Sequence, residues 1–235
     1  MKEKILGVSV SPFNYEELCE LILQDIEAKR KAFIVAINPE KIMKAQEDKE
    51  LQELLNKATY QIPDGIGVIL ASKLKGGKIR SRVTGIDMML NLCELAAKHN
   101  KKIFLYGGKP GVAEAAKEKL LDQFPRLNIS GVLNGYEKDI NLIRKTINDA
   151  KPDILFVALG SPRQEYWIVD NMDLLHPTVF QGVGGSYDVI SGNINRAPQS
   201  FQRFGLEWLY RLMKEPWRWK RQLLLPKFLI RSLKR

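Results

Sequence analysis

The sequence predicts an α/β fold: a Rossmann-like, mostly parallel sheet with helices on both faces, followed by a helical C-terminal appendage. Short runs of β-branched and apolar residues alternate along the chain with amphipathic stretches of helical period. Some runs, such as residues 154–159 (ILFVAL), are apolar throughout, which is typical of strands that helices cover on both faces. The turns that follow these runs are rich in Gly, Pro, Asn and Asp.

The expected elements follow one another as strand and helix. Strands are predicted over residues 33–37, 59–63, 103–106, 128–132, 154–159 and 178–183. Helices are predicted over residues 15–29, 39–58, 87–99, 112–124, 140–150 and 163–171. In such a sheet ligands bind beyond the carboxyl ends of the strands, so the turns that follow the strands are the place to look for chemistry.

Size and cysteine content limit the class of protein. A chain of 235 residues can bury one full core, with room for a small appendage. Cys19 and Cys93 offer neither a disulfide framework nor a zinc pattern, so a reducing cytosol is the simplest location. The N-terminal segment becomes acidic too soon for a signal peptide, and no apolar stretch is long enough to span a bilayer.

The net charge of +10 is concentrated at the C-terminus. Residues 196–235 carry 11 basic and two acidic side chains, whereas residues 1–195 carry 26 basic and 25 acidic ones. Three of the four tryptophans also lie after residue 195. We therefore predict an α/β catalytic domain over residues 1–195 and a basic, aromatic-rich appendage over residues 196–235.

The appendage has the composition of a membrane-binding element. Aromatic and aliphatic residues recur at helical spacing between Phe201 and Met213, with basic residues beside them. This pattern suits an anionic membrane surface. Nucleic-acid binding and a helical pair docked on the domain are the alternatives. The high content of Leu and Trp favours the membrane, and no nucleic-acid partner is predicted.

Two glycine turns are candidate phosphate sites. Gly107 and Gly108 follow one predicted strand, and Gly184 and Gly185 follow another. Each turn places flexible backbone amides at a helix start, which favours a phosphate or diphosphate. An ordinary tight turn is the alternative for either one, since neither matches a dinucleotide fingerprint or a Walker loop.

Asp64 is the candidate general base. It lies between Pro63 and Gly65, directly after a predicted strand. A carboxylate held there could accept the proton of a substrate hydroxyl. The alternative is a turn-forming residue or a helix N-cap, which is the commoner role of Asp before Gly.

Three further polar residues are candidates for substrate binding. Gln164 and Glu165 begin a predicted helix, where amide and acidic groups are also common for structural reasons. Arg82 could clamp a diphosphate or be a surface charge.

The chain has few of the residues and motifs that other catalytic mechanisms need. The chain has two histidines, no Asp-x-Asp pair and no GxSxG motif. We therefore predict neither a metal nor a cofactor.

Six segments, taken in order, resemble the WecG/TagA/CpsF family of glycosyltransferases: INPEKI, IPDGIGV, RVTGIDMM, ILFVALGSPRQEYWI, GVGGSYDVISGNINRAP and GLEWLYRLMKEPWRWKR. The resemblance extends from about residue 5 to residue 230. It implies transfer of a sugar from a UDP-sugar to a polyprenyl-diphosphate-linked sugar at the inner face of the cell membrane. The sequence most resembles the teichoic-acid branch, in which N-acetylmannosamine (ManNAc) passes from UDP-ManNAc to undecaprenyl-diphospho-GlcNAc with inversion, forming a β-1,4 linkage.

The resemblance also implies roles for particular residues. Asp64 would deprotonate the C4 hydroxyl of the acceptor, Asn38 and Gln164 would line the sugar pocket, and Arg82 would lie near the acceptor or diphosphate. Tail arginines that would stabilise the leaving diphosphate correspond to Arg211, Arg218 and Arg221. Teichoic-acid members often have Thr where this chain has Ala36, so the donor sugar stays open.

Two other functions remain alternatives. One is a related transferase that uses another UDP-sugar, glucose or ManNAc uronic acid, for a surface polysaccharide. The other is a nucleotide- or nucleic-acid-binding module without catalysis. The expected location is the cytoplasm, peripheral on the inner membrane face, and a homo-oligomer is possible.

Overall fold

The computed structural model describes residues 1–216, 219 and 224–233. Its centre is a six-stranded parallel sheet in the order β4-β3-β8-β7-β5-β6. The strands are β3 (Ala32–Ile37), β4 (Tyr60–Pro63), β5 (Lys102–Gly107), β6 (Asn128–Leu133), β7 (Ile154–Ala158) and β8 (Val179–Gly182). All six predicted strands are present, and the α/β, mostly parallel architecture is confirmed.

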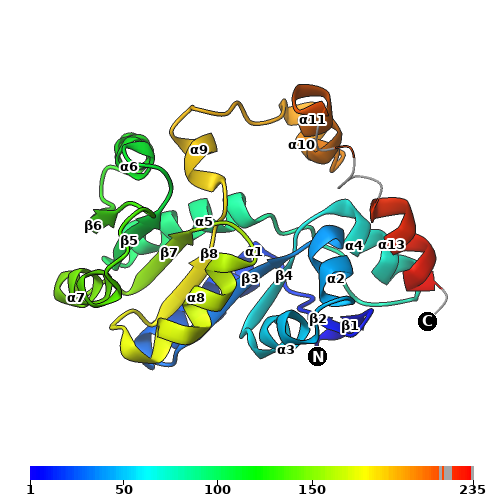
Figure 1. Cartoon of the computed structure of the whole chain (residues 1–235), viewed down its shortest axis with the longest axis horizontal. Helices are drawn as coiled ribbons and strands as arrows, with labels where there is room; N and C mark the ends of the chain where they lie inside the picture. Colours follow the sequence, from blue (N-terminus) through cyan, green and yellow to red (C-terminus); the bar gives the residue numbers. More distant parts are fainter. Residues whose placement is uncertain (217–218, 220–223, 234–235) are drawn as a thin grey trace.

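Helices cover both faces of the sheet, because strand side chains alternate between two apolar clusters. In β3, Phe33 and Val35 belong to one cluster and Ile34 to the other. The first cluster is covered by α2 (Pro39–Ala45), α3 (Lys49–Lys57), α4 (Ile66–Leu74), α7 (Ile140–Ala150) and α8 (Arg163–Asn171), which leads into the short helix η1 (Met172–Leu174). The second is covered by α1 (Tyr15–Glu27), α5 (Gly85–Lys98), α6 (Val112–Gln123) and α9 (Ser186–Ile190). Figure 1 shows α8 in front of the sheet and α5 behind it.

Three local features differ from the prediction. The single helix predicted over residues 39–58 is wrong: it is divided into α2 and α3, because the Asp48 side chain accepts a hydrogen bond from the Leu51 N–H (3.0 Å) and caps a new helix. Helix α4 was not predicted. Neither was the hairpin of β1 (Glu3–Ile5) and β2 (Val8–Val10), whose two turn residues have positive φ, as a tight hairpin turn requires.

The C-terminal segment forms three described helices. These are α10 (Gln199–Arg203), α11 (Glu207–Lys214) and α13 (Leu224–Leu233). Gly205, with φ +69°, separates α10 from α11 and interrupts the helical stripe predicted there. Helix α13 packs against α2 and α4, and its Phe228 side chain is fully buried in the first apolar cluster. Figure 1 shows α13 beside these helices and away from α10 and α11.

None of the helices formed by the described residues combines the length and apolar character that a bilayer-spanning segment requires.

Candidate active site

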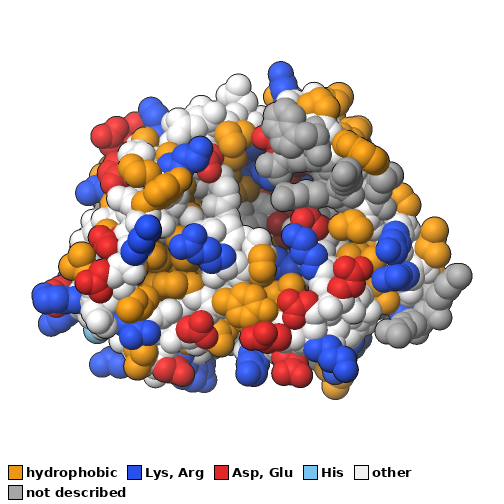
Figure 2. Space-filling view, in the orientation of Figure 1, with side chains coloured by type: hydrophobic (Ala, Val, Ile, Leu, Met, Phe, Trp, Pro, Cys, Tyr) orange, Lys and Arg blue, Asp and Glu red, His pale blue; other side chains and the backbone are white. Residues whose placement is uncertain are grey.

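A cleft of about 610 Å³ opens at the carboxyl ends of four neighbouring strands. It is lined by residues from the turns after β3, β4, β7 and β8: Asn38, Asp64, Gly160 and Gly184. The space-filling view shows the surface hollowed between α9 and the C-terminal helices (Figure 2). Helices α2, α4, α8 and α9 begin at these same turns, so their partially positive N-termini meet at one edge of the sheet. The edge is suited to an anionic ligand.

Asp64 lies in this cleft, where its backbone is tied to a neighbouring strand. Its backbone N–H donates to the Ile37 carbonyl oxygen (2.8 Å), which ties the turn after β4 to the end of β3. Gly65, not Asp64, is the N-cap of α4, and it makes no side-chain cap bond. Among the described residues, no hydrogen bond or ion pair holds the Asp64 carboxylate. Asp64 is therefore not an N-cap, whereas the other alternative, a turn-forming residue, stays a prediction.

The electrostatic surroundings of Asp64 favour a basic carboxylate. Burial raises its pKa above the ordinary value of an aspartate, since a charged group loses water contacts in the cleft. The charge of Arg82 lowers this pKa, Glu207 raises it, and Arg211 lowers it again. A raised pKa makes the carboxylate a stronger base than an ordinary aspartate.

Asn38 and Gln164 line the cleft and are held by backbone contacts. The Asn38 side-chain oxygen accepts a hydrogen bond from the Lys41 N–H (2.9 Å), which caps α2. The Gln164 side-chain oxygen accepts one from the Gly184 N–H (2.9 Å). A side chain at Gly182 would approach the Gln164 amide nitrogen to 2.6 Å and would displace this amide. Both amides are therefore fixed in position before any ligand binds.

Glu165 lies beneath the cleft and is not among its lining residues. Its carboxylate is fully buried and forms an ion pair with the Lys41 ammonium (2.8 Å). The same oxygen accepts a hydrogen bond from the Gln164 amide (3.1 Å). The structure thus gives Glu165 a positioning contact with Gln164, and its predicted contact with substrate stays a prediction. Lys41 lines the cleft and was missed by sequence reasoning, because it looked like one more surface lysine of a helix.

Arg82 links the cleft to the C-terminal helices. Its guanidinium donates to the Gln202 carbonyl oxygen (3.0 Å) and pairs with Glu207 on α11. Glu207 also pairs with Arg196 (3.3 Å), and Arg196 pairs with Asp87 at the start of α5 (2.7 Å). Although burial alone would raise the pKa of Asp87, hydrogen bonds to Arg196 and Thr84 hold that pKa below its usual value.

Sequence reasoning missed Glu207 as a cleft residue, and it missed Arg196 as the partner that pairs with Glu207. Glu207 lines the cleft, and with Glu215 it is one of the two acidic residues in the basic segment 196–235. This isolated negative charge was the signal that could have identified it. Arg211 lines the cleft from the same helix, whereas the predictions for Arg218 and Arg221 lie outside the described residues.

The two glycine turns differ in their position. Gly184 and Gly185 line the cleft, but Gly107 and Gly108 do not. A side chain at Gly107 would come within 2.5 Å of the Ala158 carbonyl oxygen, and the Gly108 N–H donates to that oxygen (2.8 Å). Close backbone packing therefore explains this pair, and its predicted contact with substrate stays a prediction.

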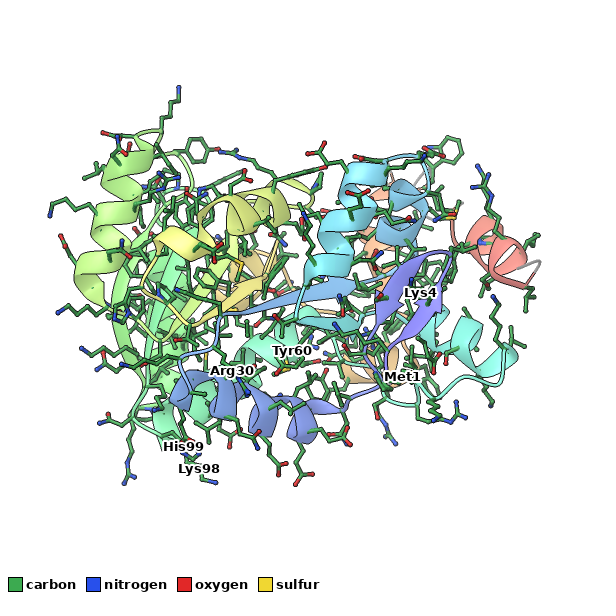
Figure 3. All side chains as sticks on the ribbon, turned by 90° about the horizontal axis from the view of Figure 1, so that it is seen from below. Met1, Lys4, Arg30, Tyr60, Lys98 and His99 are labelled. Atoms are coloured by element: carbon green, nitrogen blue, oxygen red, sulfur yellow. The ribbon has the colours of Figure 1, made fainter. Side chains whose placement is uncertain are left out.

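Other polar groups lie far from the cleft. Tyr60 donates to Asp25 (2.6 Å), which also pairs with Arg30, at the amino ends of the strands. Figure 3 shows Arg30, Tyr60 and His99 on this lower side of the molecule. Neither His99 nor His176 is among the residues that line the cleft. In the described part of the chain, no group of three His, Cys, Asp or Glu side chains is placed to hold a metal ion.

Comparison with known proteins gives one family. The chain matches the model of the glycosyl transferase WecG/TagA/CpsF family over residues 3–235. A protein of Bacillus subtilis (strain 168) is 42% identical over 209 residues, which cover 89% of this chain and 82% of that protein. A protein of Bacillus spizizenii (strain W23) is 40% identical over 209 residues, covering 89% of this chain and 81% of its own length. Both relatives are named N-acetylglucosaminyldiphosphoundecaprenol N-acetyl-beta-D-mannosaminyltransferase.

Proposed function

Because this chain belongs to the WecG/TagA/CpsF family of glycosyl transferases, we propose that it transfers ManNAc from UDP-ManNAc to undecaprenyl-diphospho-GlcNAc. The linkage is β-1,4, formed with inversion at the C4 hydroxyl of GlcNAc, and the product is the linkage unit of wall teichoic acid. The observation that carries the proposal is the Asp64 carboxylate. It stands in a cleft suited to anionic ligands, in a chain 42% identical to a transferase of this name.

Asp64 acts as the general base. Its carboxylate takes the proton of the acceptor C4 hydroxyl while that oxygen forms a bond to the anomeric carbon of ManNAc. The bond between the anomeric carbon and the phosphate oxygen breaks, and UDP leaves with the electron pair. The raised pKa of Asp64, caused first by its burial, supports this role, since proton transfer is favoured by a base stronger than an ordinary aspartate.

The leaving diphosphate accumulates negative charge, which cationic groups in the cleft stabilise. Arg211 lines the cleft, and the N-termini of α2, α4, α8 and α9 meet there with the Gly184-Gly185 turn. Arg218 and Arg221 are proposed to add to this charge. Arg82 binds the acceptor or its diphosphate, which requires it to leave Glu207.

Asn38 and Gln164 bind the sugar through their fixed amides, and Glu165 with Lys41 keeps Gln164 in place. A side chain that is already ordered loses little conformational entropy when the ligand binds, which improves both affinity and selectivity.

The lipid acceptor brings the protein to a membrane. We propose a peripheral location on the inner face of the cell membrane, with residues 196–235 as the contact to anionic lipid. Support comes from the +9 charge of this segment and from exposed apolar side chains on it, such as Phe204 and Met213.

A donor panel tests the function. The protein is incubated with prenyl-diphospho-GlcNAc and with UDP-ManNAc, UDP-GlcNAc, UDP-glucose or UDP-ManNAc uronic acid in turn, and UDP release and product mass are measured. We expect turnover with UDP-ManNAc, and none with Asp64→Asn. Preference for another donor would overturn the assignment of ManNAc, and Ala36, which lines the cleft, is then the first position to examine.

A further inference from the structure

Helix α4 is mostly apolar but only partly covered. Its sequence is IGVILASKL, and Val68 and Ala71 are buried beneath it. Leu70 and Leu74, by contrast, are 40% and 60% exposed. Apolar side chains of a helix are normally buried, so these exposed leucines point to an apolar ligand or surface.

The exposed leucines continue a line that starts inside the cleft. Ile66, Leu70 and Leu74 are four residues apart, so they lie on one side of the helix, along about 12 Å. Ile66 lines the cleft, and Leu74 lies at the last turn of the helix. These three residues, the α4 stripe, form an apolar path from the cleft wall to the protein surface.

Two close approaches of the described C-terminal residues to α4 lie at the cleft end of this stripe. Helix α13 meets α4 at Gly67, where an added Cβ would lie 2.7 Å from Leu225. The turn between α10 and α11 meets Ile66, since a Cβ on Gly205 would lie 2.9 Å from the Ile66 Cβ. Leu70 and Leu74 keep their exposed surface even though α13 packs along α4.

The charges at the outer end of the stripe suit an anionic bilayer. Lys73 and Lys75 are exposed on the last turn of α4 and just after it, and Lys78 follows them in the chain. Basic residues at this position would meet lipid phosphates at the membrane surface. The path therefore runs from the cleft toward a surface with membrane-binding character.

We propose that the α4 stripe binds the first isoprene units of the lipid acceptor as they leave the cleft. This inference rests on the proposed function, in which the acceptor joins a diphosphate to a long isoprenoid chain. With the diphosphate in the cleft, the hydrocarbon has to leave along a wall, and an apolar wall keeps it from water. The stripe thereby selects acceptors that carry a prenyl chain.

The test compares acceptors with and without that chain. The double variant Leu70→Ser/Leu74→Ser is assayed with polyprenyl-diphospho-GlcNAc and with an analogue in which a methyl group replaces the chain. The matched control is Leu142→Ser/Leu174→Ser, which changes two leucines that are similarly exposed (46% and 57%) and do not line the cleft. Binding of farnesyl diphosphate and of inorganic diphosphate, and sedimentation with anionic vesicles, are measured alongside.

In the wild type and the control we expect the polyprenyl acceptor to have the lower KM. In the stripe variant this advantage should fall about tenfold, the scale of losing one or two buried methylene-sized contacts. An unchanged KM ratio would overturn the proposal. So would a loss of vesicle binding with equal effects on both acceptors, because α4 would then be a membrane contact only. If no UDP-sugar is turned over but leucine-dependent binding of farnesyl diphosphate persists, the proposed function fails and the isoprenoid site stands.

Discussion

The two parts of the C-terminal segment are attached to the domain by different forces. Helices α10 and α11 bury no residue, and Arg82 of the domain holds them through polar bonds to Gln202 and Glu207. Helix α13 buries Phe228 and Ser232 against α2 and α4. The predicted boundary after residue 195 thus separates the chain by charge, whereas packing makes α13 part of the main core.

The difference has a consequence for the cleft, which both parts line. An anionic substrate cannot replace the apolar contacts of Phe228. We therefore expect α13 to stay in place during turnover. An arginine that is paired with a carboxylate can release the carboxylate and bind a phosphate instead, because a guanidinium forms similar hydrogen bonds to the oxygens of both anions. We expect α10 and α11 to be the part that responds to substrate.

The largest effect is expected at Asp64, in the cleft that both parts of the C-terminal segment line. Asp64→Asn should lower the turnover number by about 10²–10⁴-fold, since the amide cannot accept the hydroxyl proton. Affinity for UDP, measured by calorimetry, should stay close to that of the wild type. Turnover at the wild-type rate would exclude Asp64 as the base.

Phe228→Ala tests the apolar attachment. It should lower the free energy of unfolding by about 3–5 kcal/mol, as large-to-small changes in a packed core do. The control is Phe204→Ala at the C-terminal end of α10, whose ring is exposed and whose loss should cost about 0.5 kcal/mol or less. Chemical denaturation measures both, and equal losses would contradict the distinction between the two parts.

Glu207→Gln tests the polar attachment. Arg82 and Arg196 would lose the carboxylate between them, which should weaken the contact by about 1–3 kcal/mol. Hydrogen exchange should rise about tenfold or more in residues 199–214, with residues 224–233 unaffected. Glu118→Gln, an exposed change on α6, is the control. A uniform rise across both segments would show that they are one cooperative unit.

The smallest effect is expected in how the free energy of unfolding depends on pH through Asp64. Its folded pKa is raised by burial, so its carboxylate is less favourable in the folded than in the unfolded chain. Asp64→Asn should therefore be more stable than the wild type at neutral pH. The gap should close as pH falls through the raised pKa and vanish below about 3.8, the ordinary aspartate value. Urea midpoints of the two proteins across this pH range measure the difference in stability. A difference that grows on acidification would show that the pKa of Asp64 is lowered on folding, not raised.

Local patterns predicted much of the fold and of the cleft. The apolar runs identified all six strands of the parallel sheet, and the residues after them supplied Asn38, Asp64, Gln164 and Gly184. They missed α4, because its sequence lacks the polar face that marks an amphipathic helix. They also missed Glu207 and Arg196, whose roles depend on partners more than 100 residues away in the chain.

The sequence by itself determined the alternation of strand and helix, the position of Asp64 directly after a strand, and the concentration of charge in residues 196–235. These are local properties of neighbouring residues. The tertiary structure decided which turns share a cleft, because the order β4-β3-β8-β7-β5-β6 arises from pairing between distant strands. It placed Gly184 in the cleft, left Gly107 in backbone packing, and put Glu165 beneath the site rather than in it. Burial and distant charges then set the basicity of Asp64, which the local sequence does not specify.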